Sequence, residues 1–243
     1  MSTALSPVTR RYLREFALRL AVFLLVGAVW LFSPGRLDFT APLDLSHWPL
    51  ALLWADVLGS MLVQLNPNSG LTAGCMKQFP NRFDPVPGYD PAALRQAVRQ
   101  QNRGAVKVAV LWLAVNLLFG WLYHRGHLRA ADLVLLCALA YLCDLVCVLF
   151  FCPFQTFLMK NRCCVNCRIF AWGSWMMAAP LMCVPHWYSW SLFGAGLLVL
   201  AVWERRYFLH PERFWSGSNR LLQCAHCQEQ LCRYKLPRSL RSR

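Results

Sequence analysis

The stretch ADLVLLCALAYLCDLVCVLFF, residues 131–151, decides the fold of this chain. It is almost wholly apolar, and about 20 such residues cross the hydrocarbon core of a bilayer as one helix. Five further apolar stretches lie at 16–32, 48–65, 105–123, 169–184 and 187–203. The last two are at the short end of this length range, and we interpret them as a hairpin with one short outer turn. The sequence therefore predicts an all-α polytopic membrane helix bundle with about six transmembrane helices.

Composition favours a membrane protein over a soluble one. Apolar residues make up 57% of the 243 residues and charged residues 15%, whereas soluble domains average about 45–50% and about 25%. A chain this apolar is not intrinsically disordered. The net charge of +14 does not indicate a nucleic-acid partner, because the apolar stretches exclude a soluble nucleic-acid-binding domain.

The basic residues predict how the helices are oriented. With the N-terminus inside, all of the 25 Lys and Arg residues except Arg36, Arg125 and Arg129 fall in segments assigned to the cytosolic side. Cytosolic loops of membrane proteins carry such an excess. We therefore expect a multi-pass protein of the cell membrane with both termini cytosolic. Its positive charge then faces the anionic lipids of the inner leaflet.

The chain divides into a transmembrane bundle, residues 1–204, and a basic, cysteine-containing cytosolic tail, residues 205–243. A long cytosolic loop at 66–104 belongs to the bundle. Its first half is rich in turn-forming residues. Its second half, near residues 90–103, predicts a helix.

An interfacial helix is expected near residues 90–103. Asp90 suits the N-cap and Pro91 the first helical position. Arg95, Arg99 and Arg103 recur every four residues, which places them on one face of a helix. We predict that this face contacts anionic lipid headgroups. A binding site for an anionic metabolite is the alternative.

The 12 cysteines include two Cys-x-x-Cys pairs on the predicted cytosolic side, Cys164 with Cys167 and Cys224 with Cys227. Both sulfurs of such a pair can reach one metal ion at about 2.3 Å. One predicted transmembrane hairpin separates the pairs, so both return to the same face. We therefore predict a thiolate metal site that clamps the foot of the last hairpin. Alternate ligands are Cys163 and Cys232, with His226 a weaker one.

We expect zinc in this site, because a tetrahedral set of four thiolates suits a closed, structural zinc ion. An iron–sulfur cluster is the alternative, since eight cysteines lie on the predicted inner side and Cys152-Pro153 resembles the end of a ferredoxin ligand run. However, no complete ferredoxin spacing is present. Free thiols and thiol–disulfide exchange remain as further alternatives.

Polar residues also occur inside the predicted spans. Asp56 and Asp144 are acids within apolar stretches, and Asn116 lies in a neighbouring span. Acidic residues in a span usually face the interior of the bundle or a water-filled path. They predict either a proton or cation path or a set of hydrogen bonds between helices.

The C-terminal third resembles a group of uncharacterised bacterial membrane proteins. The resemblance rests on KNRCCVNCRIF at 160–170, HPERFW at 210–215 and the tail with Cys224, Cys227 and Cys232. It implies a bacterial cytoplasmic membrane and carries no activity with it.

Three functions are therefore predicted, in order. The first is a non-enzymatic scaffold or metal-responsive protein with a structural thiolate site, for which no catalytic residue is assigned. The second is an iron–sulfur electron-transfer subunit that exchanges electrons with a soluble redox partner or another membrane subunit. The third is a proton- or cation-coupled transporter that uses Asp56 and Asp144.

Overall fold

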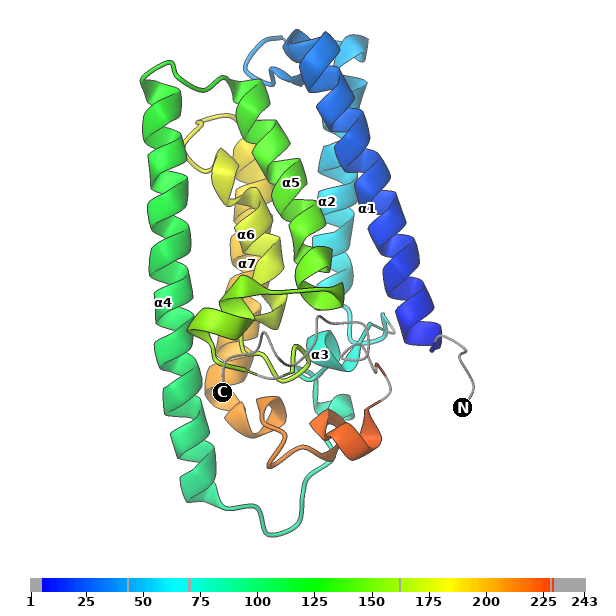
Figure 1. Ribbon diagram of the computed structural model, residues 1–243, viewed down its shortest axis with the longest axis vertical. Coiled ribbons are helices and arrows are strands. Elements are labelled where there is room, and N and C mark those ends of the chain that lie inside the picture. The colour runs from blue at the N-terminus through cyan, green and yellow to red at the C-terminus, as the bar shows by residue number, and fades with distance from the viewer. Residues whose placement is uncertain (1–5, 43, 70, 162, 228, 230–243) are drawn as a thin grey trace.

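The computed structural model describes residues 6–42, 44–69, 71–161, 163–227 and 229. The α-helices in this part of the chain are α1 (Pro7–Phe32), α2 (Trp48–Leu65), α3 (Ala73–Met76), α4 (Pro91–His124), α5 (Ala130–Leu149), α6 (Gly173–Ala178) and α7 (Trp187–Leu209). The long helices run along the long axis of the molecule, and short helical turns connect them (Figure 1). The predicted all-α class is confirmed for the described residues.

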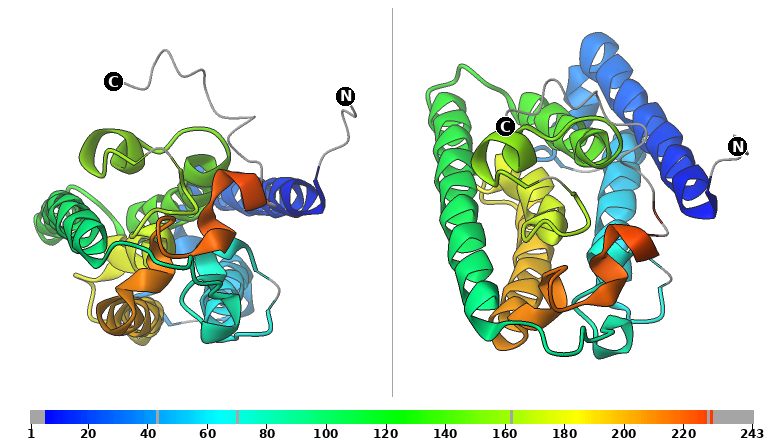
Figure 2. Two further views of the ribbon diagram at one scale, coloured as in Figure 1. Left: turned by 90° about the horizontal axis from the view of Figure 1, so that it is seen from below. Right: turned by 60° about the horizontal axis from the view of Figure 1, so that its bottom comes forward.

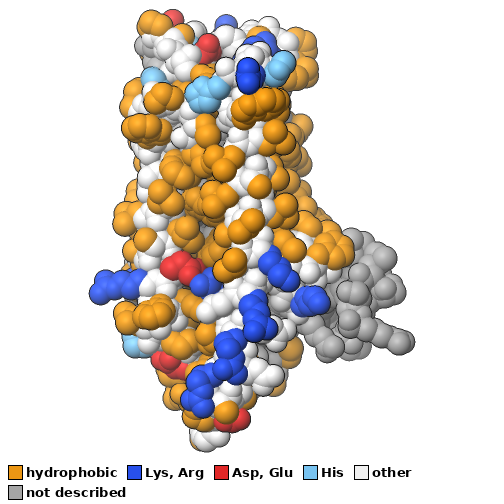
Figure 3. Space-filling view, turned by 90° about the vertical axis from the view of Figure 1, so that its left-hand side faces the viewer, with side chains coloured by type: hydrophobic (Ala, Val, Ile, Leu, Met, Phe, Trp, Pro, Cys, Tyr) orange, Lys and Arg blue, Asp and Glu red, His pale blue; other side chains and the backbone are white. Residues whose placement is uncertain are grey.

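Four helices are long and apolar enough to cross a membrane: α1, α4, α5 and the continuous helical stretch Leu45–Leu65 that ends in α2. Their outer faces carry exposed apolar side chains such as Leu18, Leu62 and Val110. Figure 3 shows the resulting hydrophobic surface above a region of charged side chains. An exposed apolar surface of this extent is typical of contact with lipid, so the chain is a membrane protein.

Helix α4 joins two stretches that the sequence analysis separates. Asp90 caps it by accepting hydrogen bonds from the backbone N–H groups of Ala92 (2.8 Å) and Ala93 (3.2 Å). The helix then continues for 34 residues through Gly104, where the predicted interfacial helix was expected to give way to a span. At 1.5 Å per residue it is about 51 Å long, so it exceeds the hydrocarbon core of about 30 Å.

The arginines of the predicted interfacial helix therefore lie on an extension of a spanning helix. Arg95, Arg99 and Arg103 are exposed, and Figure 3 shows basic side chains gathered below the apolar surface. Their contact with lipid headgroups stays a prediction.

The predicted span at 169–184 is broken. It consists of a 3-10 turn (Phe170–Trp172), the six-residue helix α6 and a second turn (Ala179–Leu181). Pro180, which has no backbone N–H, lies where α6 would otherwise continue. The segment still reaches the far end of the bundle, where the Cys183 carbonyl oxygen lies 3.2 Å from His124 Nε2.

The main apolar core lies between α1, α2, α5, α6 and α7. It includes Val26, Leu53, Leu133, Ala178 and Leu192, whose side chains are all fully buried. Helices α6 and α7 approach each other closely at Gly196, where a Cβ atom would lie 2.8 Å from the Ser174 carbonyl oxygen. This packing holds the short α6 against the full-length α7.

The loops at one end of the bundle form a compact layer that we call the foot, residues 71–90, 150–161, 163–169, 210–227 and 229. Figure 2 shows these segments crossing below the helices. Both described ends of the chain meet here, since Thr9 Oγ1 donates a hydrogen bond to the Glu229 carbonyl oxygen at 3.3 Å. The segment 163–169 packs on Trp203, Tyr207 and Phe214.

Candidate functional site

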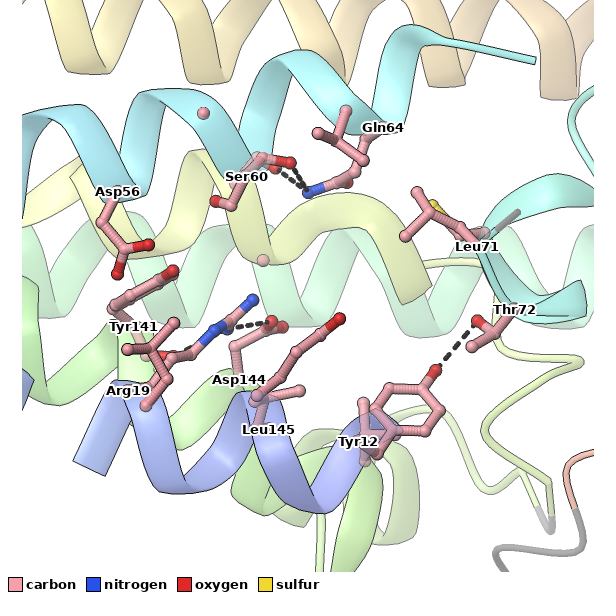
Figure 4. A pocket seen from close by; sticks show the side chains of 18 of the residues that line it. Tyr12, Arg19, Asp56, Ser60, Gln64, Leu71, Thr72, Tyr141, Asp144 and Leu145 are labelled. Atoms are coloured by element: carbon pink, nitrogen blue, oxygen red, sulfur yellow. Dashed lines mark hydrogen bonds and ion pairs between the residues drawn. The ribbon is translucent and has the colours of Figure 1, made fainter. Parts of the chain in front are cut away.

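A polar cavity of about 330 Å³ lies among α1, α2, α5 and α6. Its lining combines charged, hydroxyl and amide side chains with apolar ones. Figure 4 shows the polar members turned toward the space between the helices: Arg19 from α1; Asp56, Ser60 and Gln64 from α2; Tyr141 and Asp144 from α5. Three of these four helices have an apolar span, so the polar side chains gather inside the apolar bundle.

An ion pair joins α1 to α5 at the cavity. Arg19 Nη1 lies 3.0 Å from Asp144 Oδ2 and also donates to the Tyr141 carbonyl oxygen at 2.9 Å. The guanidinium carbon lies 4.0 Å from the centre of the Tyr141 ring, a cation–π distance. Arg19 is buried, and removing one partner of a buried pair leaves an uncompensated charge.

Arg19 was not among the predicted site residues. Its charge placed it among the residues predicted to be cytosolic, but Arg19 lies within α1 and pairs with Asp144. Its position between Leu18 and Leu20, inside an apolar run, was the available signal. A basic residue within a span usually pairs with an acid in the bundle interior, and Asp144 was already identified.

A glycine on α6 makes room for the Asp144 carboxylate. A Cβ atom at Gly173 would lie 2.2 Å from Asp144 Oδ1. No side chain with a Cβ therefore fits here without displacing the carboxylate from Arg19. Gly173 thus lets the start of α6 pack against the Asp144 carboxylate.

Asp56 has a different environment from Asp144. Its carboxylate interacts with the Tyr141 side chain (Figure 4), and its Oδ2 atom is buried without a hydrogen-bond partner in the described part of the chain. One turn further along α2, Ser60 Oγ donates to the Val57 carbonyl oxygen at 2.7 Å. Gln64 Nε2 donates to Ser174 Oγ at 2.8 Å. An unpartnered buried carboxylate oxygen is costly and needs an explanation.

The charges that line the cavity leave one negative charge uncompensated. Arg19 pairs with Asp144, and Arg11 pairs with Glu15 at 3.1 Å near the start of α1. Asp56 is the remaining charged group among the described lining residues. The cavity therefore favours a positively charged occupant over a negatively charged one.

Asn116 lies apart from this cavity. It is buried on α4, where its Nδ2 donates to the Trp112 carbonyl oxygen at 2.8 Å. Its Oδ1 has no hydrogen-bond partner within the described residues. The structure thus brings Asp56 and Asp144 to one cavity and leaves Asn116 outside it.

The two cysteines of the first predicted metal pair are buried in the foot. Cys164 Sγ donates to Gln155 Oε1 at 3.2 Å. Burial raises the pKa of Cys167 to about 12, so this thiol keeps its proton at neutral pH. Zinc binds the deprotonated thiolate, so a bound ion would have to displace this proton.

Cys163 is the thiol of this loop that lies near Cys224 and Cys227. Burial raises its pKa, and the neighbouring Cys227 and Cys224 raise it further, against hydrogen bonds from the backbone that lower it. His226 is exposed, and Cys232 lies outside the described residues. Among those residues no group of three or more His, Cys, Asp or Glu side chains is placed to hold a metal ion. The zinc site and the iron–sulfur alternative stay predictions that this geometry does not support.

Lys77 is a buried charge that the sequence analysis did not identify. It is 1% exposed, and its Nζ donates to the carbonyl oxygens of Val165 (2.6 Å) and Cys167 (2.8 Å). Nζ also lies 5.5 Å from the centre of the Trp203 ring and 5.6 Å from that of Phe214. Burial lowers the pKa of Lys77 to about 8. Lys77 therefore links the foot segments.

Comparisons with protein-family models, with curated proteins and with solved structures found no match to this chain. The polar cavity and its uncompensated carboxylate are therefore the basis on which a function is proposed.

Proposed function

We propose that this chain is a multi-pass protein of the bacterial cytoplasmic membrane that binds and carries a cation in the polar cavity. Six passes with both termini cytosolic fit this proposal. The broken segment at 169–184 and helix α7 run between the same two ends of the bundle as the four apolar helices, and the basic residues gather on one side.

The Asp56 carboxylate carries the proposal. Its Oδ2 atom is buried and has no hydrogen-bond partner among the described residues, and Asp56 is one of the residues that line the cavity. A carboxylate in a low-dielectric setting strongly favours a nearby positive charge. A cation bound beside Asp56 would supply the missing partner.

The ion pair next to Asp56 has a supporting role in this proposal. Arg19 neutralises Asp144, and the Tyr141 carbonyl oxygen and ring hold the guanidinium in place. The cavity therefore keeps a single net negative charge. A monovalent cation matches that charge better than a divalent one.

Modification by dicyclohexylcarbodiimide, an apolar reagent for carboxyl groups, tests whether Asp56 binds a cation. The purified protein is treated in detergent with and without Na⁺, K⁺, tetramethylammonium or tetraphenylphosphonium, and mass spectrometry follows the rate at each acid. We expect at least one of these cations to slow modification of Asp56 and to leave the exposed Asp90 unaffected. If none slows it, or if Asp90 responds equally, the proposal is wrong.

Uptake of the protecting cation into vesicles that contain the protein tests the carrier role. We expect Asp56→Asn to abolish uptake, because it removes the charge and keeps the shape. Asp90→Asn is the matched control, since asparagine caps a helix as well as aspartate does. Equal uptake by the Asp56→Asn and parent proteins would contradict a role for the carboxylate.

A further inference from the structure

We infer that the cation is an amphiphilic organic cation that enters the cavity from the bilayer, through an opening between α1 and α2. This inference rests on the proposed function and adds to it the chemical class of the ligand and its route. Three independent features of the cavity support it: its size, its opening and its lining.

The cavity is larger than an inorganic ion requires. Its volume of about 330 Å³ lies within the range of about 300–1,000 Å³ that is typical of small-molecule sites. Hard metal ions need several oxygen ligands within about 2.6 Å. Among the described residues no group of three acids, cysteines or histidines converges in this way. A bulky, singly charged ligand fits such a space better than a bare ion.

The cavity reaches the lipid-facing surface. Leu18 of α1 and Val63 of α2 both line it, and these side chains are 57% and 42% exposed. Figure 1 shows α1 leaning away from α2 toward the foot. Gly59 lies in this opening and has nothing within 4 Å of the position of its missing Cβ. The absence of a side chain there keeps the passage wide.

Leu18 and Val63 lie within helices long and apolar enough to cross a membrane. Val63 lies two residues before the end of α2, and Leu18 lies two residues into the apolar run 16–32 of α1. An opening at this depth faces the boundary between acyl chains and headgroups. An amphiphilic molecule concentrates at that boundary. It can therefore place its charged part beside Asp56 and leave its apolar part between Leu18 and Val63.

The lining suits an organic cation more than a strongly hydrated ion. The aromatic side chains of Tyr12, Tyr141 and Phe170 border the cavity together with the single uncompensated carboxylate. Aromatic rings attract organic ammonium groups through cation–π interactions. A large cation with diffuse charge also loses less hydration energy on burial than a small ion does, because that cost falls as ionic size grows.

Binding of tetraphenylphosphonium to the purified protein in lipid nanodiscs tests the ligand class. We expect saturable binding that Asp56→Asn weakens by about 30-fold or more, the usual effect of removing one partner of a buried charge pair. Tetraphenylborate has the same shape and the opposite charge, and we expect no saturable binding of it. If both probes bind equally, or if the Asp56→Asn and parent proteins bind equally, the measured binding is only partition of the probe into lipid. Either result would overturn the inference.

Narrowing the opening tests the route. We expect Gly59→Leu to weaken tetraphenylphosphonium binding by about tenfold or more, because the new side chain occupies the passage. Gly27→Leu is the matched control: Gly27 also has nothing within 4 Å but does not line the cavity. If Gly59→Leu does not fold, Val63→Trp narrows the same opening. Unchanged binding by whichever of these variants folds would overturn the lateral route.

The two proposals can fail separately. If Na⁺ or K⁺ protects Asp56 from modification and tetraphenylphosphonium does not bind, the cavity still serves a cation and the amphiphilic class is wrong. If no cation protects Asp56, both proposals are wrong.

Discussion

Lys77 in the foot and Asp56 in the cavity are both ionisable groups inside the molecule, but Lys77 is buried whereas Asp56 is half-buried, and their surroundings differ. Two carbonyl oxygens and two aromatic faces surround the Lys77 ammonium group. Asp56 has a buried oxygen without a hydrogen-bond partner in the described part of the chain, next to an empty volume. A charge that only holds a fold together is partnered by the protein itself. The difference therefore separates a structural charge from one that is open to a ligand.

Replacement of Lys77 should have the largest effect on stability. We expect Lys77→Met to lower the free energy of unfolding by about 2–5 kcal/mol, because two buried carbonyl oxygens lose their donor. Thermal unfolding in detergent measures this. Lys107→Met, at an exposed position on α4, is the matched control and should change little. If both variants unfold alike, Lys77 is not the structural link that its contacts indicate.

A second comparison uses two glycines that line the same cavity. We expect Gly173→Ala to lower the free energy of unfolding by about 1–3 kcal/mol, because its Cβ would collide with Asp144 and disturb the pair with Arg19. Gly59→Ala should cause no loss, since its Cβ meets nothing within 4 Å. The measurement is again thermal unfolding. Equal stability of the two variants would show that Asp144 can move without cost.

The foot should also give the protein a distinctive alkaline stability profile. Burial lowers the pKa of Lys77 from 10.5 to about 8. Between these two pH values the unfolded chain binds more protons at this residue than the folded chain does, so Lys77 makes the stability rise with pH. Burial raises the pKa values of Cys75 and Cys167 to about 12. Above pH 9 the folded state therefore retains protons that the unfolded chain loses, and stability falls.

We expect Lys77 to contribute a rise in the free energy of unfolding of about 1 kcal/mol from pH 8 to pH 9, most of which the two thiols offset, and the net value to fall by about 1 kcal/mol per pH unit above pH 9. Unfolding measured at each pH tests this profile. Lys77→Met should remove the rise, and Cys75→Ala should make the fall shallower. A profile that is flat from pH 8 to pH 10 would contradict both assignments.

The smallest effect is expected at the surface of the foot. Arg220 forms two contacts with Asp84, at 2.9 and 3.1 Å, but both side chains are substantially exposed to solvent. Exposed ion pairs contribute little, so Arg220→Gln should leave the unfolding temperature and the binding of tetraphenylphosphonium unchanged. A clear loss of either would mean that the surface of the foot is coupled to the cavity.

The sequence was sufficient to predict the helices whose apolar runs are long. The stretches at 16–32, 48–65 and 105–123 lie in helices, and so does 131–151 up to Leu149, because continuous apolar residues and few breakers leave no other stable structure in lipid. Asp90 and Pro91 also marked the true start of α4. Its continuity through Gly104 was not predicted, since the change from polar to apolar residues indicated a boundary that the backbone does not have.

The candidate site was predictable in part. Asp56 and Asp144 were identified from their cost in an apolar segment, and both line the cavity. Arg19 was missed because its partner is 125 positions away, and a contact of that kind depends on how helices pack. The cysteine pairs show the converse problem. The sequence correctly predicted that Cys164 and Cys167 lie at the end of the bundle that carries the C-terminal segment. It did not show that their thiols would be buried.

The unbroken α4 has a mechanical consequence. A rigid rod that passes through the bilayer and continues beyond it acts as a lever. Arg95 precedes Val106 by 11 residues on α4, and Val106 is an apolar residue that is 62% exposed. At 1.5 Å per residue, a tilt of about 10° around Val106 would displace the backbone at Arg95 sideways by about 3 Å. Changes in the thickness or tension of the surrounding lipid would thus be transmitted to a charged surface outside it.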